Sequence, residues 1–267
     1  MNADILTTES AYSSTEMLGV KIHVVDRAGL LNAVIRAVET GHGSVISNVN
    51  VHAMNLAYRD ADFRAILNAS DLVFVDGAGV LLGAAIAGVK VGERLTYADW
   101  VDDLFKLCAA RDWPVFYLGD IEQVGDDFRR ELARRHPNCR LVGCHHGFFQ
   151  KTGLESNAVV EAINASGAKV LLVGMSMPIQ EKRVWANRER LQPPLRLTTG
   201  GMARIYTGHI KRGPPWMTRN GLEWLYRLAM QPSYTWKRYL IGNPLFLWRV
   251  LLSRFGLGAP LPRSRGD

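Results

Sequence analysis

Short, continuous apolar runs recur along the chain, and each is followed by a stretch whose apolar residues return every three or four positions. Runs of this kind are typical of strands buried on both faces of a parallel sheet, and the spacing that follows is typical of helices packed against it. We expect strands at residues 20–25, 44–51, 71–76, 114–120, 140–143, 169–174 and 195–199. We expect helices at residues 27–40, 52–68, 80–87, 96–111, 121–135, 155–166 and up to about 191. The alternation predicts an α/β fold with a doubly wound, mostly parallel sheet.

One of these strands ends in a carboxylate. Asp76 closes the apolar run at residues 71–76, and Gly77 and Gly79 follow it. Ligands of open α/β sheets bind outside the carboxyl ends of the strands, so an acid at this edge is well placed for chemistry. Asp76 could equally begin a turn or cap the next helix.

Other polar residues and glycines also fall at predicted strand ends. Asn48 and Asn50 come late in the second strand, while Gly119 and Gly174 end two later ones. Gln180 and Glu181 follow at the start of a helix, where free backbone N–H groups suit phosphate or ribose recognition. This pattern fits a nucleotide-type ligand lying across the edge of the sheet.

Several common site motifs are missing. The chain has no Gly-x-x-x-x-Gly-Lys loop, and Gly77-Ala-Gly79 lacks the third glycine of the dinucleotide fingerprint. The cluster Cys139, Cys144, His145 and His146 has the spacing of no established metal site, so we expect no metal and no cofactor. Three cysteines indicate a reducing compartment without a disulfide framework.

Charge divides the chain unevenly. The net charge is +7, but residues 205–267 hold ten basic and two acidic residues, which gives +8 there and −1 before them. Residues 1–19 are polar and predict a flexible leader without a signal peptide. The expected organisation is therefore this leader, a nucleotide-binding domain at 20–204, and a basic helical C-terminal appendage at 205–267. Such asymmetry indicates an anionic partner for the appendage.

The appendage is also rich in aromatic residues. It holds four of the seven tryptophans, and residues 243–255 form an amphipathic pattern interrupted by Arg249 and Arg254. That stretch is too short and too charged to span a bilayer, but Trp, Phe and Leu beside Arg suit a helix in the membrane interface. An ordinary helix packed on the body or on another subunit is the alternative.

Five segments together resemble the WecG/TagA/CpsF group of bacterial glycosyltransferases, glycosyltransferase family 26. They are NVHAMNLA at 50–57, ASDLVFVDGAGV at 69–80, GERLT at 92–96, VGMSMPIQE at 173–181 and NGLEWLYRL at 220–228. The resemblance implies a Rossmann-like body and an inverting, metal-independent transfer from a UDP-sugar to a polyprenyl-diphosphate-linked saccharide in cell-envelope or exopolysaccharide assembly. It also implies a cytoplasmic protein, peripheral on the inner face of the membrane, whose appendage closes over the site.

The resemblance suggests a role for individual residues. Asp76 resembles the catalytic base, Arg94 the donor-phosphate contact, and Gln180 with Glu181 the pocket pair. With the strand-end residues above, these make up the expected donor site. Basic residues of the appendage resemble those that complete the site at the acceptor or diphosphate, and we expect them to be Arg212, Arg227, Lys237 and Arg238.

The chain departs from the family pattern in four places. Asn48 stands where the family usually has Thr, and Ala203-Arg204 replaces an aromatic-Asp pair after the Gly-Gly turn. Arg183 takes the place of a Trp, and Tyr234 that of an Arg. These changes concern the identity of the sugar and the local geometry of the site, and they leave Asp76 in place.

Other functions remain consistent with the residues alone. A soluble nucleotide-binding oxidoreductase or methyltransferase could use the same sheet, and a non-enzymatic module could grip nucleic acid with the basic, aromatic appendage. The contiguous apolar run at residues 245–255 favours a membrane over nucleic acid, because base stacking does not need adjacent Leu and Val. The partners that we expect are the UDP-sugar, the lipid-linked acceptor and an anionic membrane surface, with no nucleic acid. A homo-oligomer is left open.

Overall fold

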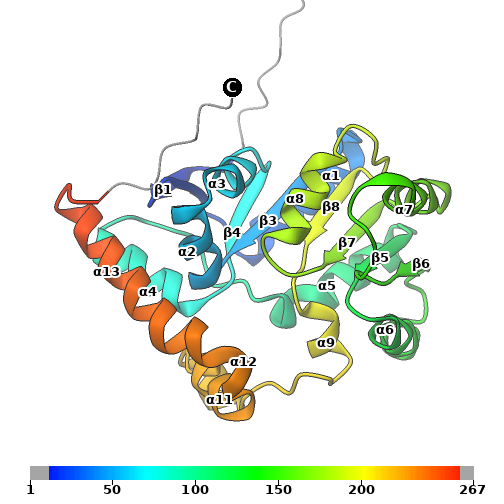
Figure 1. The fold of residues 1–267 in the computed structure, drawn as a ribbon. Coiled ribbons are helices and arrows are strands. Elements are labelled where there is room, and N and C mark those ends of the chain that lie inside the picture. The colour runs from blue at the N-terminus through cyan, green and yellow to red at the C-terminus, as the bar shows by residue number, and fades with distance from the viewer. Residues whose placement is uncertain (1–11, 259–267) are drawn as a thin grey trace, which may run out of the picture.

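The computed structural model describes residues 12–258, so the predicted leader at 1–11 and the last nine residues lie outside the described part. At its centre is a six-stranded parallel sheet with the order β4-β3-β8-β7-β5-β6 (Figure 1). The strands are β3 (Ser44–Val49), β4 (Leu72–Val75), β5 (Val115–Gly119), β6 (Leu141–His145), β7 (Val170–Gly174) and β8 (Leu195–Thr198). The chain is α/β and Rossmann-like, as predicted.

Helices cover both faces of the sheet, which makes it doubly wound. One face packs against α1 (Arg27–Thr40), α5 (Tyr97–Ala110), α6 (Glu122–Arg135) and α9 (Met202–Tyr206). The other packs against α2 (Val51–Arg59), α3 (Ala61–Asn68), α7 (Gly153–Ala165) and α8 (Ile179–Ala186). Successive strand residues point to opposite faces, so Phe74 joins the first core while Val73 and Val75 join the second. This explains why the strands read as unbroken apolar runs.

The first predicted strand does not belong to this sheet. Instead, β1 (Ser14–Met17) and β2 (Val20–His23) form an antiparallel hairpin beside β4. The expected flexible leader was therefore too long, because residues 14–17 are a paired strand. His23 Nδ1 accepts a 2.9 Å hydrogen bond from the backbone N–H of Val73. The hairpin thus occupies part of the outer side of β4, which would otherwise leave backbone donors of an edge strand open.

The helix expected at residues 52–68 is two helices, α2 and α3. Asp60 ends the first in an extended conformation and caps the second, where its Oδ1 accepts a 2.9 Å hydrogen bond from Phe63 N–H. Its other oxygen pairs with Lys182 Nζ at 2.6 Å. An aspartate that satisfies a free N–H group of the next helix favours a break that the apolar periodicity does not reveal.

The appendage is helical, as predicted. Its elements are α10 (Pro215–Arg219), α11 (Glu223–Met230), α12 (Pro232–Trp236), the π-helical turn η1 (Lys237–Ile241) and α13 (Gly242–Arg254). Figure 1 shows α13 lying along α4 (Ala78–Ala87) at the β4 side of the sheet. Phe246 and Val250 of α13 are buried in the core beside α2 and α4. A Cβ atom on Gly83 would come within 2.6 Å of the Phe246 ring, so glycine permits this close packing.

Arg249 of α13 packs on the body, which is the arrangement expected under the alternative to an interfacial helix. Its guanidinium is buried, donates a 2.7 Å hydrogen bond to Asn55 Oδ1 and lies 4.2 Å from the centre of the Tyr58 ring. Asn55 in turn donates to the carbonyl of Gly242 at 2.7 Å. The exposed apolar residues of α13 are Trp248 and Leu251, followed by Phe255. Within residues 12–258, none of the helices is long and apolar enough to cross a membrane.

Candidate active site

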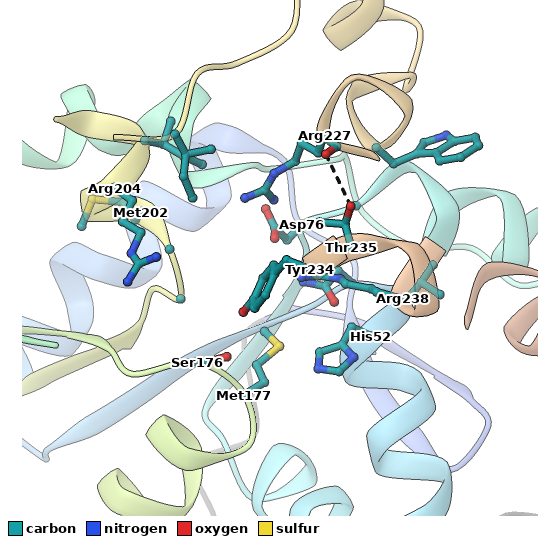
Figure 2. A pocket seen from close by; sticks show the side chains of 18 of the residues that line it. His52, Asp76, Ser176, Met177, Met202, Arg204, Arg227, Tyr234, Thr235 and Arg238 are labelled. Carbon is teal, nitrogen blue, oxygen red and sulfur yellow. Dashed lines mark hydrogen bonds between the residues drawn. The ribbon is translucent and has the colours of Figure 1, made fainter. Parts of the chain in front are cut away.

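A cavity of about 1750 Å³ lies at the carboxyl edge of the sheet and is closed on one side by the appendage. Residues at or just beyond five strand ends line it: Asn48, Asp76, Asp120, Gly174 and Thr199. Figure 2 shows Asp76 with Arg227 and Arg238 of the appendage near it, while Arg204 stands apart on the other side. The topology therefore brings together polar residues from distant parts of the chain, as expected for a ligand site in this class of sheet.

Asp76 is held by its backbone immediately after β4. Its N–H donates to Val49 O at 2.9 Å, and its carbonyl accepts from the Thr96 hydroxyl at 3.3 Å. Asn50 caps α2, because its Oδ1 accepts a 3.1 Å hydrogen bond from Ala53 N–H. The amide N–H groups of Asn50 are left to bind the Asp76 carboxylate. This arrangement explains why Asn50, which ends one strand, faces the acid that ends the next.

Burial raises the pKa of Asp76 to about 6. The Asn50 hydrogen bond and the charges of Arg238 and Arg227 oppose this shift, while the carboxylate of Glu223 adds to it. A carboxylate with a pKa near 6 is a stronger base than an ordinary aspartate and is still mostly ionised at pH 7. The site thus holds a group suited to taking a proton from a hydroxyl.

Two guanidinium groups of the appendage line the same part of the cavity. Among the described residues, no hydrogen-bond partner is found for the buried Nε of Arg227. Burial and the nearby positive charge of Arg238 lower the pKa of the His52 imidazole to about 4, so His52 is neutral at pH 7. The hydroxyl of Thr235 donates to the carbonyl of Arg227 at 3.4 Å, the dashed line in Figure 2, and connects α11 with α12. Two cations facing one cavity favour an anionic ligand.

Arg94 lines the cavity but is engaged elsewhere as well. Its Nη1 donates to the Thr218 carbonyl of the appendage at 2.7 Å, and its Nη2 lies 3.8 Å from Asp99. The residue itself forms an isolated parallel bridge with Val75 at the outer side of β4. Arg94 therefore lines the cavity and also holds α10 in place.

Some polar atoms on the cavity wall are buried and lack partners in the described structure. They are Asn48 Oδ1, Tyr97 Oη and Thr199 Oγ1. Buried polar groups are normally paired, so such atoms in a cavity indicate places where a ligand completes the hydrogen bonding. Asn48 and Asn50 both line the cavity.

Other predicted site residues are not on the cavity wall. Gln180 lies beneath it, where Oε1 accepts a 3.0 Å hydrogen bond from Gly200 N–H and Nε2 donates to Glu181 at 2.7 Å. Gly119 packs against the backbone of Gly174, and a Cβ atom on Gly119 would come within 2.3 Å of the Gly174 carbonyl oxygen. These residues shape the strand ends and lie behind the surface that a ligand would contact.

Two of the predicted basic residues also lie elsewhere. Arg212 pairs with Asp99 at 2.7 Å and with Glu223 at 3.4 Å, so carboxylates already occupy its guanidinium. Lys237 is exposed, with Nζ 5.5 Å from the centre of the Trp236 ring. Of the four basic residues expected at the acceptor or diphosphate, Arg227 and Arg238 reach the cavity.

Several residues that line the cavity were not predicted from the sequence. Arg204 and Asp120 form a two-point ion pair there although they are 84 positions apart. Tyr97, Thr199 and Glu223 also line the cavity. Asp120 does end a predicted strand, which was an available signal, whereas Arg204 was noted only as a departure from the family pattern.

Metal-ligand geometry is not found in the described part of the chain. It contains no group of three or more His, Cys, Asp or Glu side chains that could hold an ion. Cys108, Cys139 and Cys144 are free thiols, and the rings of His145 and His146 are tilted by 34° with their centres 4.7 Å apart.

Comparison with known proteins identifies the family of the chain. The model of the glycosyl transferase WecG/TagA/CpsF family matches residues 15–259. The chain belongs to this family. Two similar relatives of this WecG/TagA/CpsF protein are both named N-acetylglucosaminyldiphosphoundecaprenol N-acetyl-beta-D-mannosaminyltransferase. The protein from Bacillus subtilis (strain 168) is 28% identical over 78% of this chain and 79% of its own length. The protein from Staphylococcus aureus (strain MRSA252) is 25% identical over 77% and 78%.

Proposed function

We propose that this WecG/TagA/CpsF glycosyltransferase moves a sugar from a UDP-sugar to a saccharide linked to polyprenyl diphosphate, with inversion at the transferred carbon. The names of the relatives support a lipid-diphosphate acceptor and a hexosamine-type sugar. The observation that carries the proposal is the placement of Asp76, with its raised pKa, beside two arginines at the carboxyl edge of the sheet. A base and a pair of cations are what this transfer needs in one cavity.

In the proposed step, the Asp76 carboxylate takes the proton from an acceptor hydroxyl. The hydroxyl oxygen attacks the anomeric carbon of the donor, and the bond from that carbon to UDP breaks with its electron pair leaving on the diphosphate. A single displacement from the opposite face inverts the carbon. A positioned carboxylate base contributes typically ~10²–10⁴-fold to such a rate.

The leaving diphosphate gains negative charge as the bond breaks. Arg227 and Arg238, with Arg94 nearby, are the candidates for stabilising it. Cations fixed before the reaction stabilise developing charge without reorganising. Guanidinium groups therefore supply the charge that a divalent ion supplies in metal-dependent transferases, and the proposed reaction needs no metal.

The lipid acceptor requires the cavity to open beside a membrane. The appendage carries many exposed apolar side chains, here together called the apolar appendage surface: Trp216, Leu225, Met230, Tyr234, Trp236, Leu240, Ile241, Trp248, Leu251, Phe255 and Leu257. Met230, Tyr234 and Leu240 also line the cavity. Exposed Arg219, Lys237 and Arg254 lie in the same helices. Aromatic and basic residues together suit the interface of an anionic membrane, which supports a peripheral position on its cytoplasmic face.

A panel of donors tests the proposal directly. The full-length protein is given a short-chain polyprenyl-diphosphate acceptor bearing N-acetylglucosamine, with UDP-N-acetylmannosamine, its uronic acid or UDP-glucose, and the products are read by mass. We expect one of these donors to be transferred at a rate that a chelator leaves unchanged. Absence of transfer from every donor would contradict the proposed reaction, and loss of activity with the chelator would contradict its metal independence.

A further inference from the structure

The cavity wall also carries an ion pair, between Arg204 and Asp120, on the other side from Asp76. Arg204 Nε and Nη2 donate to the two oxygens of Asp120 at 2.6 and 2.7 Å. The Asp120 side chain is 5% exposed, whereas that of Arg204 is 43% exposed. Figure 2 shows the Arg204 guanidinium well separated from Asp76, Arg227 and Arg238. The pair therefore faces a different part of the cavity from the proposed site of sugar transfer.

Asp120 is fixed in place by its surroundings. It adopts a left-handed backbone conformation with φ of 56°, its N–H donates to Gly174 O at 3.1 Å, and its carbonyl accepts from Gly147 N–H at 2.7 Å. Its Oδ1 also accepts from Ile121 N–H at 2.9 Å. The carboxylate is thus committed to holding one edge of the Arg204 guanidinium. Among residues 12–258, no partner is found for Arg204 Nη1, so its N–H groups remain for a ligand.

Sheet geometry gives the distance between the two ends of the cavity. Asp76 follows β4 and Asp120 follows β5, and these strands are four steps apart in the sheet. At about 4.8 Å a step, the strand ends are separated by roughly 19 Å. A nucleotide-sugar with its sugar at Asp76 and its diphosphate at Arg227 and Arg238 would place its nucleoside near β5.

We propose that Arg204 and Phe148 recognise the base of the donor nucleotide, with Asp120 as the residue that positions Arg204. This inference rests on the proposed nucleotide-sugar donor. Phe148 lines the same cavity from the loop after β6, and its side chain is 69% exposed. An exposed aromatic ring offers a face on which a base can stack. Gly147 N–H donates a 2.7 Å hydrogen bond to the carbonyl of Asp120, which attaches this loop to the residue that holds Arg204.

Charge and hydrogen-bonding chemistry select the class of ligand. Because Asp120 neutralises Arg204, the pair carries no net charge to attract phosphate, unlike Arg227 with its unpartnered Nε. Arg204 offers donors and no acceptor. It therefore favours a base edge with carbonyl oxygens, as on uracil, over the edge of adenine, which has no carbonyl. Arg204 is thus a specificity-determining residue for the base of the donor.

Titration calorimetry with UDP, ADP and inorganic pyrophosphate tests the inference. The variants are the neutral pair Asp120→Asn/Arg204→Gln, which leaves no unpaired buried charge, and Phe148→Ala. Leu154→Ala, at an exposed residue outside the cavity, is the matched control. We expect both variants to bind UDP about tenfold or more weakly and pyrophosphate as the wild type does, and the neutral pair to lose the preference for UDP over ADP. Arg227→Ala should weaken UDP and pyrophosphate alike.

The outcomes separate the two proposals. Folding of each variant is checked by its thermal midpoint, and Phe148→Ala provides a second test if the neutral pair is unstable. Folded variants with wild-type affinity and preference for UDP would overturn the base-recognition role while leaving the donor proposal standing. A wild-type protein that does not prefer UDP over ADP would overturn the uridine donor itself.

Discussion

Arg212 of the appendage donates a 2.7 Å hydrogen bond to Asp99 at the start of α5, so its guanidinium helps to join the appendage to the body. The same guanidinium lies 3.4 Å from Glu223 in α11. Arg94 of the body reaches the other way and donates to Thr218 O of α10. We call Arg94, Asp99, Arg212 and Glu223 the clasp, because these residues connect the two sides of the cavity.

The clasp should control how firmly α10 and α11 are seated. We expect Arg212→Ala and Asp99→Ala each to speed limited proteolysis of residues 207–222 by several-fold, and the double variant to add little, since both remove the same pair. Global stability should change by less than about 1 kcal/mol, because the pair is partly exposed. Glu131→Ala, which breaks the exposed pair with Arg134, is the control and should not alter cleavage there. Additive effects of the two clasp variants would show that the pair does not act as a unit.

Asp76→Asn should remove the proposed catalytic base. We expect turnover to fall ~10²–10⁴-fold while UDP affinity stays near that of the wild type, because the amide keeps the shape but cannot accept a proton. In the wild type, kcat/KM should decline as the pH falls through about 6, where the carboxylate becomes protonated. Initial rates between pH 5 and 8 measure both effects, with exposed Glu122→Gln as the control. Near-normal turnover in Asp76→Asn would refute the assignment.

The same substitution should stabilise the fold at neutral pH. The folded-state pKa of Asp76 is raised, so the folded protein binds its proton more tightly than the unfolded chain does. The contribution of Asp76 to the stability of the fold is fully present below about pH 3.8, the pKa of this carboxyl in the unfolded chain. It is lost as the pH rises through 6. We therefore expect Asp76→Asn to unfold at a higher temperature than the wild type at pH 8, with the difference shrinking as the pH falls from 6 towards 4. An equal difference at every pH would contradict this.

The apolar appendage surface should bind membranes. We expect the triple variant Trp236→Ser/Trp248→Ser/Phe255→Ser to co-sediment at least about tenfold more weakly with vesicles containing anionic lipid, because three exposed rings are lost. The full-length chain is the right material: a chain ending near residue 206 would lose Phe246 and Val250 from the core. Leu154→Ser is a control far from this surface. Unchanged co-sedimentation of the triple variant would argue against a membrane-binding role for these side chains.

Much of the sheet could be predicted because its strands are buried on both faces and read as continuous apolar runs. The hairpin β1–β2 was missed as a pair because four-residue strands with exposed Ser14 and Glu16 carry little apolar signal. The break at Asp60 was missed because the apolar positions of α2 and α3 follow one another smoothly. Both features depend on local hydrogen bonds, to the partner strand and to Phe63 N–H, that periodicity does not encode.

The site was predictable where it follows from strand ends and less so where it follows from packing. Asp76, Asn48 and Asn50 line the cavity because the edge of a parallel sheet gathers the residues at the end of each strand. Arg94 joins them through its bridge with Val75 beside β4. Residue type alone could not show that Arg212 faces carboxylates while Arg227 faces the cavity. The pair between Arg204 and Asp120 needed the fold, because nothing in their spacing relates them.

The packing of Phe246 and Val250 against α2 and α4 means that the appendage is fastened at both ends. Residues 207–241 leave the body after α9 and return to it at α13, so they form a strap rather than a free flap. The entropy of bringing the ends of such a loop together is lost once, when the protein folds, and not at each turnover. The cavity can then open only as far as residues 207–241 can move between α9 and α13. A lipid-linked acceptor would then reach the cavity beside a strap whose two ends stay packed on the body.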